Sequence, residues 1–298
     1  MESLFTVVGR PGPIEERVLA GLAESNVSPG HRVGDGVALR TLESTSGHRG
    51  APLVFLHGRG HAAALWAPFL ASFATTRRVV GIDLPGFGRS GAPPPKGRGI
   101  DYFARPVESV IASMDAPVLV GHSLGGYVAL DIALARRAPI AGLVLVDPMG
   151  IAESLPLRAR AYLGFGPERL AQLRGLFARR APRADAPLRW AGDDEGDARA
   201  LAALREELLR SRGTRAAAAA FANAARTHVR DRIAEIDAPT LLVWGSNDTT
   251  FPLPHAIHAR AAMPRAALAR VDAGHSPHLT HPGTVQRAIR GWLADAAL

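Results

Sequence analysis

The chain has 298 residues, 47% of them hydrophobic, which is the composition of an ordinary globular protein with enough apolar residues for one large α/β domain or two smaller domains. It contains no cysteine, so disulfides, thiolate nucleophiles and cysteine-ligated zinc are excluded. The formal net charge is +8, but no zinc-finger spacing, aromatic RNA-binding motif or basic-region heptad accompanies it, so nucleic-acid binding is not expected.

Seven apolar runs have the length and composition of strands, and helical patterns separate most of them. The predicted strands are Val37 to Leu42, Pro52 to Leu56, Arg78 to Asp83, Pro117 to Gly121, Ile140 to Asp147, Pro239 to Trp244 and Ala266 to Asp272. The predicted helices between and after them are Ala62 to Ala74, Tyr102 to Met114, Leu124 to Arg137, Leu253 to Met263 and Thr284 to Leu293. Alternation of this kind predicts an α/β fold with a mostly parallel central sheet and helices on both faces.

Two segments interrupt this alternation. Residues 1–36 form an N-terminal extension with a predicted helix from Ile14 to Ser25, to which we assign no role. Residues 151–236 contain no convincing strand, only helical segments such as Asp197 to Arg212 and Thr214 to Thr227. Most of the excess charge lies there, with 16 arginines and nine acidic residues between positions 158 and 232. We therefore predict a core of residues 37–150 and 237–298, with residues 151–236 inserted as a helical unit.

The strongest chemical signal is the sequence VGHSLGG at a predicted strand-to-helix turn. Ser123 stands there between Gly121 and Gly125, and G-x-S-x-G between a parallel strand and a helix is the nucleophile elbow, a strained turn that exposes the serine hydroxyl above the sheet. The glycines let the neighbouring backbone approach closely, and the following helix directs its unpaired amides at the same point. Ser123 is therefore the predicted nucleophile.

A serine hydroxyl needs a base, and the base needs an acid to orient it. Asp248 follows the strand that ends at Trp244, and His275 follows the strand that ends near Asp272. The carboxyl ends of parallel strands meet at one edge of the sheet, so these residues are expected to converge on Ser123. Asp147 also follows a strand and is the alternative acid. Asp248 is preferred because its Gly/Ser/Asn loop can turn a carboxylate toward a histidine.

The remaining site residues are predicted from the loops nearby. The amide of Leu124, after the nucleophile, and the amide of Arg59, in the loop FLHGRGHA, are expected to form the oxyanion hole, with Gly60 as the alternative donor. His57 in that loop is expected to be a structural hydrogen-bonding residue rather than a catalyst.

Two other motifs are rejected. His275, His278 and His281 have a metal-like spacing, but Pro277 and Pro282 prevent a regular helical face and no carboxylate shares the spacing, so no metal site is predicted. The segment GFGRSG fits a dinucleotide-binding pattern, yet three prolines follow it and cannot open the helix that would bind a pyrophosphate. No cofactor is expected.

Together these residues resemble the α/β-hydrolase superfamily, in its large group with a helical cap. The resemblance runs from about Pro52 to the C-terminus through HGRG, GIDLPGFGRSG, GHSLGG, WGSND followed by FP, and AGHSPH. It implies an α/β-hydrolase fold in which the insertion between the sixth and seventh strands forms a lid over the site, and a cofactor-free esterase, lipase, thioesterase, amidase or carbon–carbon bond hydrolase. The serine argues against the dehalogenase and epoxide hydrolase branches, which carry aspartate there. HGRG also departs from the HGGG of many esterases and from the HGGPG of proline-type aminopeptidases.

The sequence thus predicts a serine hydrolase acting on an ester, thioester or related acyl bond of a small-molecule substrate, through an acyl-enzyme. Two alternatives stay open: an acyltransferase or biosynthetic cyclase on the same triad, and a ligand-binding protein with a vestigial site. No run approaches the roughly 18 apolar residues of a membrane span. The start MESLFTVVGRPGP lacks the pattern of a signal peptide, so a cytoplasmic location is expected.

Overall fold

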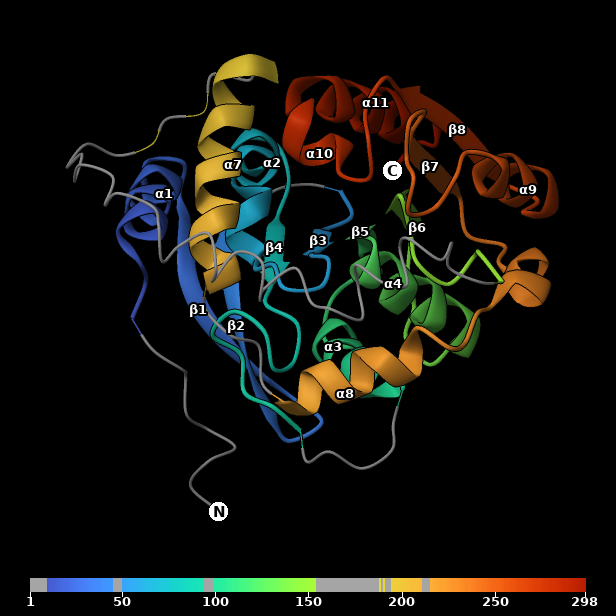
Figure 1. Ribbon diagram of the computed structural model, residues 1–298, viewed down its shortest axis with the longest axis horizontal. Helices are drawn as coiled ribbons and strands as arrows, with labels where there is room; N and C mark the ends of the chain where they lie inside the picture. Colours follow the sequence, from blue (N-terminus) through green and yellow to red (C-terminus); the bar gives the residue numbers. More distant parts are fainter. Residues whose placement is uncertain are drawn as a thin grey trace.

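The computed structural model describes residues 10–44, 50–93, 99–153, 188, 190, 194–210 and 215–298. Its central element is a sheet of eight strands in the order β1-β2-β4-β3-β5-β6-β7-β8 (Figure 1). The strands are β1 (Val27–Gly34), β2 (Val37–Ser44), β3 (Leu53–Leu56), β4 (Val79–Ile82), β5 (Val118–His122), β6 (Gly142–Val146), β7 (Thr240–Gly245) and β8 (Ala266–Val271). Strands β3 to β8 pair in parallel, whereas β2 pairs antiparallel with both β1 and β4.

The central strands are short and wholly buried because both faces of the sheet are covered. Every residue of β3, β4, β5, β6 and β7 is buried, which is the reason these strands read as continuous apolar runs rather than as alternating ones. The register places Val54 between Val80 and Leu119 in the middle of the sheet. The predicted mostly parallel α/β architecture is confirmed.

Two hydrophobic cores lie on opposite faces of this sheet. Successive strand residues alternate between the cores, so Val54 belongs to one and Phe55 to the other. Residues of α3, α4, α8 and α9 fill the first core, and residues of α1, α2, α7 and α11 fill the second (Figure 1). The helical elements are α1 (Pro13–Glu24), η2 (Ala63–Trp66), α2 (Ala67–Ala74), α3 (Asp101–Ile111), α4 (Leu124–Ala135), α7 (Asp194–Arg210), α8 (Arg215–Ala224), η3 (Arg230–Glu235), α9 (Pro254–Ala262), α10 (Pro277–Thr280) and α11 (Pro282–Asp295).

Strand β1 was missed by the sequence analysis, which left residues 1–36 without a role. It is an edge strand with an alternating burial pattern and the sequence VSPGHRVG, so it lacks a continuous apolar run. A tight turn joins it to β2, and both turn residues, Asp35 and Gly36, have positive φ angles of 47° and 74°. An Asp-Gly pair between two strands is a strong hairpin signal, and it was present in the sequence.

Helix α7, from the predicted insertion, is fixed to the rest of the molecule at both ends. The Asp194 carboxylate accepts hydrogen bonds from the Thr284 amide (3.1 Å) and hydroxyl (2.6 Å) at the start of α11. The Glu207 carboxylate accepts from the amides of Ile14 (3.0 Å) and Glu15 (2.8 Å) in the first turn of α1, where a negative charge stabilises a helix. Much of the insertion, including residues 154–187 and 191–193, lies outside the described residues.

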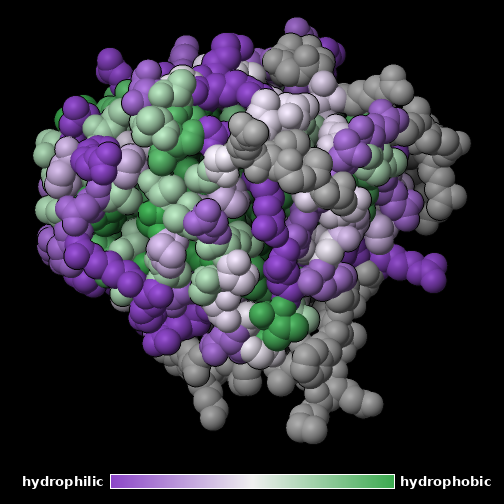
Figure 2. Space-filling view, turned by 180° about the vertical axis from the view of Figure 1, so that it is seen from behind, coloured by the Kyte–Doolittle hydropathy of each residue, from purple (hydrophilic) through white to green (hydrophobic). Residues whose placement is uncertain are grey.

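The described surface is largely polar. Among the described residues only two large hydrophobic side chains are exposed, Val33 and Ile257, and Figure 2 shows hydrophilic side chains along much of the rim of the back face. None of the described helices has the length and hydrophobicity needed to cross a membrane.

Candidate active site

Ser123 lies at a strained turn between β5 and α4. Its φ and ψ angles are 50° and −112°, a conformation that costs a non-glycine residue about 1–3 kcal/mol. The turn is tight enough to require its glycines: a Cβ on Gly121 would lie 2.4 Å from the Gly125 carbonyl oxygen, and one on Gly125 would lie 2.3 Å from that of Leu56. The residues flanking Ser123 therefore have the geometry of the nucleophile elbow.

Three side chains from distant parts of the chain meet at this turn. The His275 Nε2 atom lies 3.1 Å from the Ser123 hydroxyl oxygen, and its Nδ1 atom lies 2.8 Å from Asp248 Oδ2. Asp248 follows β7 and His275 follows β8, so the shared edge of the parallel sheet gathers them. The structure thus brings together the three residues that were predicted to act together.

Backbone amides fix the orientation of the Asp248 carboxylate. Its Oδ1 atom accepts hydrogen bonds from the amides of Thr250 (2.6 Å) and Phe251 (3.0 Å), which leaves Oδ2 for His275. A carboxylate can only accept, so we assign the imidazole proton to Nδ1 and the acceptor role to Nε2. In this tautomer His275 is ready to take a proton from the Ser123 hydroxyl.

The loop after β3 packs directly against Ser123. A Cβ added to Gly58 would lie 3.4 Å from the Ser123 Cβ and 2.6 Å from His122 Nδ1. Arg59 follows on the same loop, and Leu124 is the first residue of α4. Both amides thus belong to segments that adjoin Ser123, and their roles as oxyanion donors stay predictions, as does that of Gly60. The Arg59 guanidinium lies 4.5 Å from the ring centroid of Phe221 in α8.

His57 fixes the shape of this loop. Its Nδ1–H donates to the Gly58 carbonyl (2.7 Å), and its Nε2 accepts from the Leu84 amide (2.8 Å) in the loop after β4. Burial lowers the pKa of His57, so the imidazole stays neutral in this pairing. These contacts are those of the structural hydrogen-bonding residue that the sequence analysis expected.

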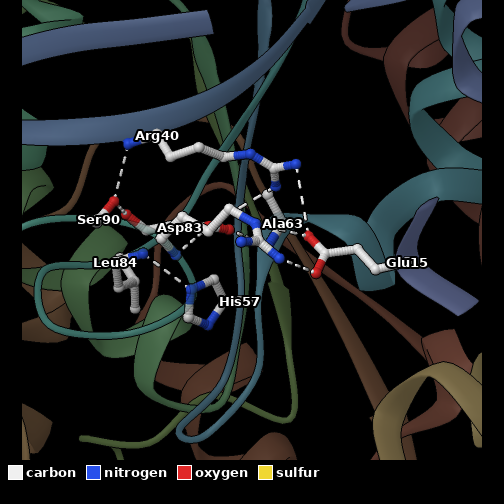
Figure 3. A network of polar contacts seen from close by, with 8 residues as sticks. Glu15, Arg40, His57, Ala63, Asp83, Leu84 and Ser90 are labelled. Atoms are coloured by element: carbon white, nitrogen blue, oxygen red, sulfur yellow. Dashed lines mark hydrogen bonds and ion pairs between the residues drawn. The ribbon is translucent and has the colours of Figure 1, made fainter. Parts of the chain in front are cut away.

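A charge network in which Glu15, Arg40 and Asp83 are buried supports the same region (Figure 3), and the partly buried Arg89 pairs with Glu15. The Asp83 carboxylate accepts from the amides of Ala63 (2.7 Å) and Arg89 (2.9 Å) and lies 3.6 Å from the Arg40 guanidinium. Glu15 in α1 lies 3.5 Å from Arg40 and 2.6 Å from Arg89. The network ties α1 and β2 to the segment that contacts His57, and sequence reasoning did not find it.

Behind the site lies a cluster of buried aromatic rings: His61, His122, His278 and Trp66. The ring centroids of His122 and His278 are 4.2 Å apart, and those of Trp66 and His278 are 4.4 Å apart. His122 Nε2–H donates to the His275 carbonyl (2.9 Å), so the residue before the elbow serine helps to hold the proposed base. His278 is buried and packs against Trp66. Among the described residues, His275, His278 and His281 do not form a group with the spacing of metal ligands.

The buried histidines make stability depend on pH. Burial, aided by neighbouring positive charge, lowers the pKa of His61, His122 and His278 well below 6.5, and burial also lowers that of His57. Below about pH 6.5 the unfolded chain therefore binds protons that the folded chain does not. Each such group removes about 1.4 kcal/mol of unfolding free energy per pH unit there.

Two buried carboxyls change the unfolding free energy in the opposite direction from the histidines as the pH falls. Burial raises the pKa of Asp147 well above its usual range and that of Asp131 to about 6, so each favours the folded state as the pH falls. Four histidines outweigh two carboxyls, and we expect the unfolding free energy from urea titrations to fall between about pH 6.5 and pH 5. An unchanged or rising unfolding free energy would contradict the neutral state of these histidines.

Within the described residues, one group has the spacing of metal ligands: oxygen atoms of Asp147 and Asp248 and a nitrogen atom of His275 lie within 4.8 Å of one another. Two of these residues already use their ligand atoms in hydrogen bonds, because both Asp248 oxygens and both His275 nitrogens have partners. The donor set therefore serves hydrogen bonding, and the prediction that no metal is held here stays a prediction.

Comparisons with known proteins identify the family of this chain. Residues 53–288 match the alpha/beta hydrolase family. A protein of Pseudomonas syringae pv. syringae (strain B728a) described as "Putative carbamate hydrolase RutD" is 30% identical over 257 residues, which cover 83% of this chain and 95% of that protein. A protein of Bos taurus described as "(Lyso)-N-acylphosphatidylethanolamine lipase" is 39% identical over 113 residues, which cover 36% of this chain and 32% of that protein.

Solved structures share the fold. A putative lipase from Acinetobacter baumannii AYE superimposes with a TM-score of 0.75 at 19% identity over 97% of this chain and 98% of that one. Est816, described as an N-acyl homoserine lactone degrading enzyme, superimposes with a TM-score of 0.67 at 26% identity over 88% of this chain and 99% of that one. From the family match, the RutD relatives and these folds, this chain belongs to the alpha/beta hydrolase family.

Proposed function

We propose that this protein is a serine hydrolase that cleaves an ester, thioester or related acyl bond of a small molecule through an acyl-enzyme. The observation that carries the proposal is the continuous path of contacts from Ser123 through His275 to Asp248 at the edge of the sheet. Membership of a hydrolase family supports it. No cofactor is required, because the three side chains supply the nucleophile, the base and the orienting acid.

The chemistry follows from these positions. The Ser123 oxygen attacks the substrate carbonyl while His275 Nε2 takes the hydroxyl proton, and the amides of Leu124 and Arg59 stabilise the negative oxygen of the tetrahedral intermediate. His275 then donates that proton to the leaving alcohol, thiol or amine as its bond to the carbonyl breaks. Water then attacks the acyl carbonyl while His275 takes its proton, and His275 returns that proton to the Ser123 oxygen as the bond to the acyl group breaks and the acid is released. One oxyanion donor contributes a factor of about 10²–10³ in kcat.

The relatives guide the choice of substrates. The proteins described as putative carbamate hydrolases match most of this chain, and a carbamate carbonyl can accept the same attack as an ester. We therefore include carbamates beside esters, thioesters and lactones of graded acyl length in the substrate range to be measured.

We also propose that residues 151–236 form a lid over the site. In support, Arg59 of the loop beside Ser123 packs on Phe221 of α8. The hydroxyls of Tyr127 in α4 and Thr227 lie 2.9 Å apart, and the Val229 amide donates to the Gly150 carbonyl (2.8 Å). These contacts hold the end of the insertion against the elements that flank Ser123.

Covalent labelling tests the proposal. A fluorophosphonate probe reacts with an activated serine, so we expect peptide mass spectrometry to find it on Ser123 of the folded protein and not on the heat-unfolded chain. The variant Ser123→Ala should not be labelled, whereas Ser246→Ala, which removes an exposed serine after β7, should be labelled like the parent. Failure to label Ser123 would contradict the proposal and favour a ligand-binding protein.

Product analysis separates hydrolysis from transfer. With an activated ester and a competing alcohol or amine, a hydrolase gives mainly the free acid, because water reaches the acyl-enzyme. A predominance of the transferred acyl product would identify the protein as an acyltransferase on the same triad.

A further inference from the structure

The proposed function uses one carboxyl beside His275, but the structure places two there. Asp147 is wholly buried at the end of β6, and Asp248 is 5% exposed. A carboxyl oxygen of each and a ring nitrogen of His275 lie within 4.8 Å of one another. Asp147 also has a positive φ angle of 40°, an uncommon conformation for a residue with a side chain. The surrounding fold therefore holds the two carboxyls together.

The hydrogen bonds around this pair leave one oxygen without a donor. Asp147 Oδ1 accepts from the Gly245 amide (2.9 Å). Asp248 Oδ1 accepts from two amides, and its Oδ2 faces His275 Nδ1. Asp147 Oδ2 is buried, and no donor among the described residues reaches it. An ionised oxygen in that position would be costly, whereas a protonated oxygen would itself be a donor.

The charges nearby favour the protonated form. The titratable groups that face Asp147 are Asp248 and His275, and no lysine or arginine of the described ranges forms an ion pair with it; the ion pair at this place joins His275 to Asp248. Two adjacent buried carboxylates repel each other, so one of them keeps its proton. Burial and the neighbouring Asp248 raise the pKa of Asp147 well above its usual range.

We propose that Asp147 is a neutral carboxylic acid whose proton is hydrogen-bonded to the Asp248 carboxylate, so that Asp147 is a positioning residue for the acid of the triad. The inference rests on the proposed function. It accounts for the unpartnered Asp147 oxygen and gives Asp248 a donor beside its two backbone amides and His275. Asp248 then stays ionised in a buried place, where it can hold His275 in the tautomer that accepts the Ser123 proton.

The two replacements of Asp147 differ in what they preserve. Asp147→Asn keeps the shape, an acceptor for the Gly245 amide and an N–H donor for Asp248, so we expect it to lose less than about tenfold in kcat for an activated ester. Asp147→Ala removes the donor and should lose more, with an altered pH profile of kcat/KM. Asp248→Asn should lose about 10⁴-fold in kcat, because an amide favours the wrong His275 tautomer.

The opposite ranking would overturn the inference. If Asp147 were the ionised acid of the triad, Asp147→Asn would suffer the larger loss and Asp248→Asn the smaller one. A failure of Asp147→Ala to fold leaves the comparison of the two asparagine variants intact.

Two measurements do not depend on activity, and they separate this inference from the proposed function. The infrared difference spectrum of wild type minus Asp147→Asn at about pH 7 should contain the carbonyl band of a protonated acid, since Asp147 stays neutral there. Asp237→Asn, which changes an exposed carboxylate paired with Arg136, should lose a carboxylate band instead. A carboxylate band lost in both variants would show that Asp147 is ionised.

Stability gives the second measurement. A proton held by Asp147 only in the folded state makes wild type lose stability, relative to Asp147→Asn, as the pH rises. The ratio of their unfolding constants, wild type over variant, should therefore increase about tenfold per pH unit between about pH 5 and pH 7. A ratio that does not change with pH would overturn the inference, even if Ser123 is labelled.

The two proposals can therefore fail separately. If both measurements agree with a neutral Asp147 but Ser123 is not labelled, the proposed function fails while the inference about Asp147 and Asp248 stands.

Discussion

The variant His275→Ala is expected to lower kcat for hydrolysis of an activated ester by about 10⁴ to 10⁶-fold. Without the imidazole, the Ser123 hydroxyl, which lies 3.1 Å from Nε2, keeps its proton and is a poor nucleophile, and the leaving group receives no proton. The residual rate comes from substrate binding and the oxyanion donors alone. Steady-state kinetics on an activated ester measure the loss, and the fluorophosphonate reaction rate at Ser123 should fall with it.

The matched control is His281→Ala. His281 is six residues further along the chain, and its ring contacts the Thr280 hydroxyl (2.9 Å) rather than the site. We expect its kcat to stay within about threefold of wild type, because its ring contacts Thr280 and not Ser123 or Asp248, and because surface substitutions change the unfolding free energy by only about 0.5 kcal/mol, so the fold is kept. Equal losses in both variants, or none in His275→Ala, would contradict the assignment of the base.

Local sequence signals were sufficient for strands β2 to β8 of the sheet and for the convergence of Ser123, Asp248 and His275 at its edge. Strands such as β5 and β7 are buried on both sides, so their apolar runs are visible without an alignment. Ser123 directly follows β5 and Asp248 lies in the loop after β7, whereas His275 lies in the loop after β8, which is only partly buried. The carboxyl ends of these parallel strands meet at one edge of the sheet. The convergence of three residues far apart in the chain could therefore be predicted from their positions after parallel strands.

Long-range polar pairing has no such local signal. Glu15 meets Arg40 and Arg89 across the fold, and nothing in the sequence around residue 15 distinguishes it from the neighbouring Glu16. The closeness of Asp147 and Asp248 was also invisible: each was weighed as the acid, and the structure shows that they adjoin. Strand β1 differs, because its Asp-Gly turn was readable but its polar, half-exposed sequence concealed the strand.

The charge network of Glu15, Arg40, Asp83 and Arg89 is connected to the loop beside the proposed triad. The Asp83 carboxylate accepts from the amides of Ala63 and Arg89. The amide of Leu84, the residue after Asp83, donates to His57 (Figure 3). The Nδ1–H of His57 in turn donates to the Gly58 carbonyl. Gly58 adjoins Ser123. A chain of contacts therefore leads from α1 to the predicted oxyanion loop through the buried side chains of Glu15, Arg40, Asp83 and His57.

The largest loss of unfolding free energy is expected from Glu15→Gln, which breaks the charge network. Glu15→Gln keeps the shape of the side chain but removes its charge, and it leaves Arg40, which is 2% exposed in its side chain, with Asp83 as its remaining ion-pair partner. Removing one partner of a buried ion pair costs about 3–5 kcal/mol, because the other charge stays buried without full compensation. Urea unfolding of the two proteins should show a loss of this size in unfolding free energy.

A second glutamate provides the matched control for this change. Glu195→Gln removes the same charge from an exposed pair with Arg199, four residues along α7, and exposed pairs contribute little because water screens both ions. We expect its unfolding midpoint to coincide with that of wild type. Equal midpoints for Glu15→Gln and Glu195→Gln would show that the buried network is not what holds α1 to the sheet, and that the hydrophobic contacts of Val18 and Leu22 are sufficient.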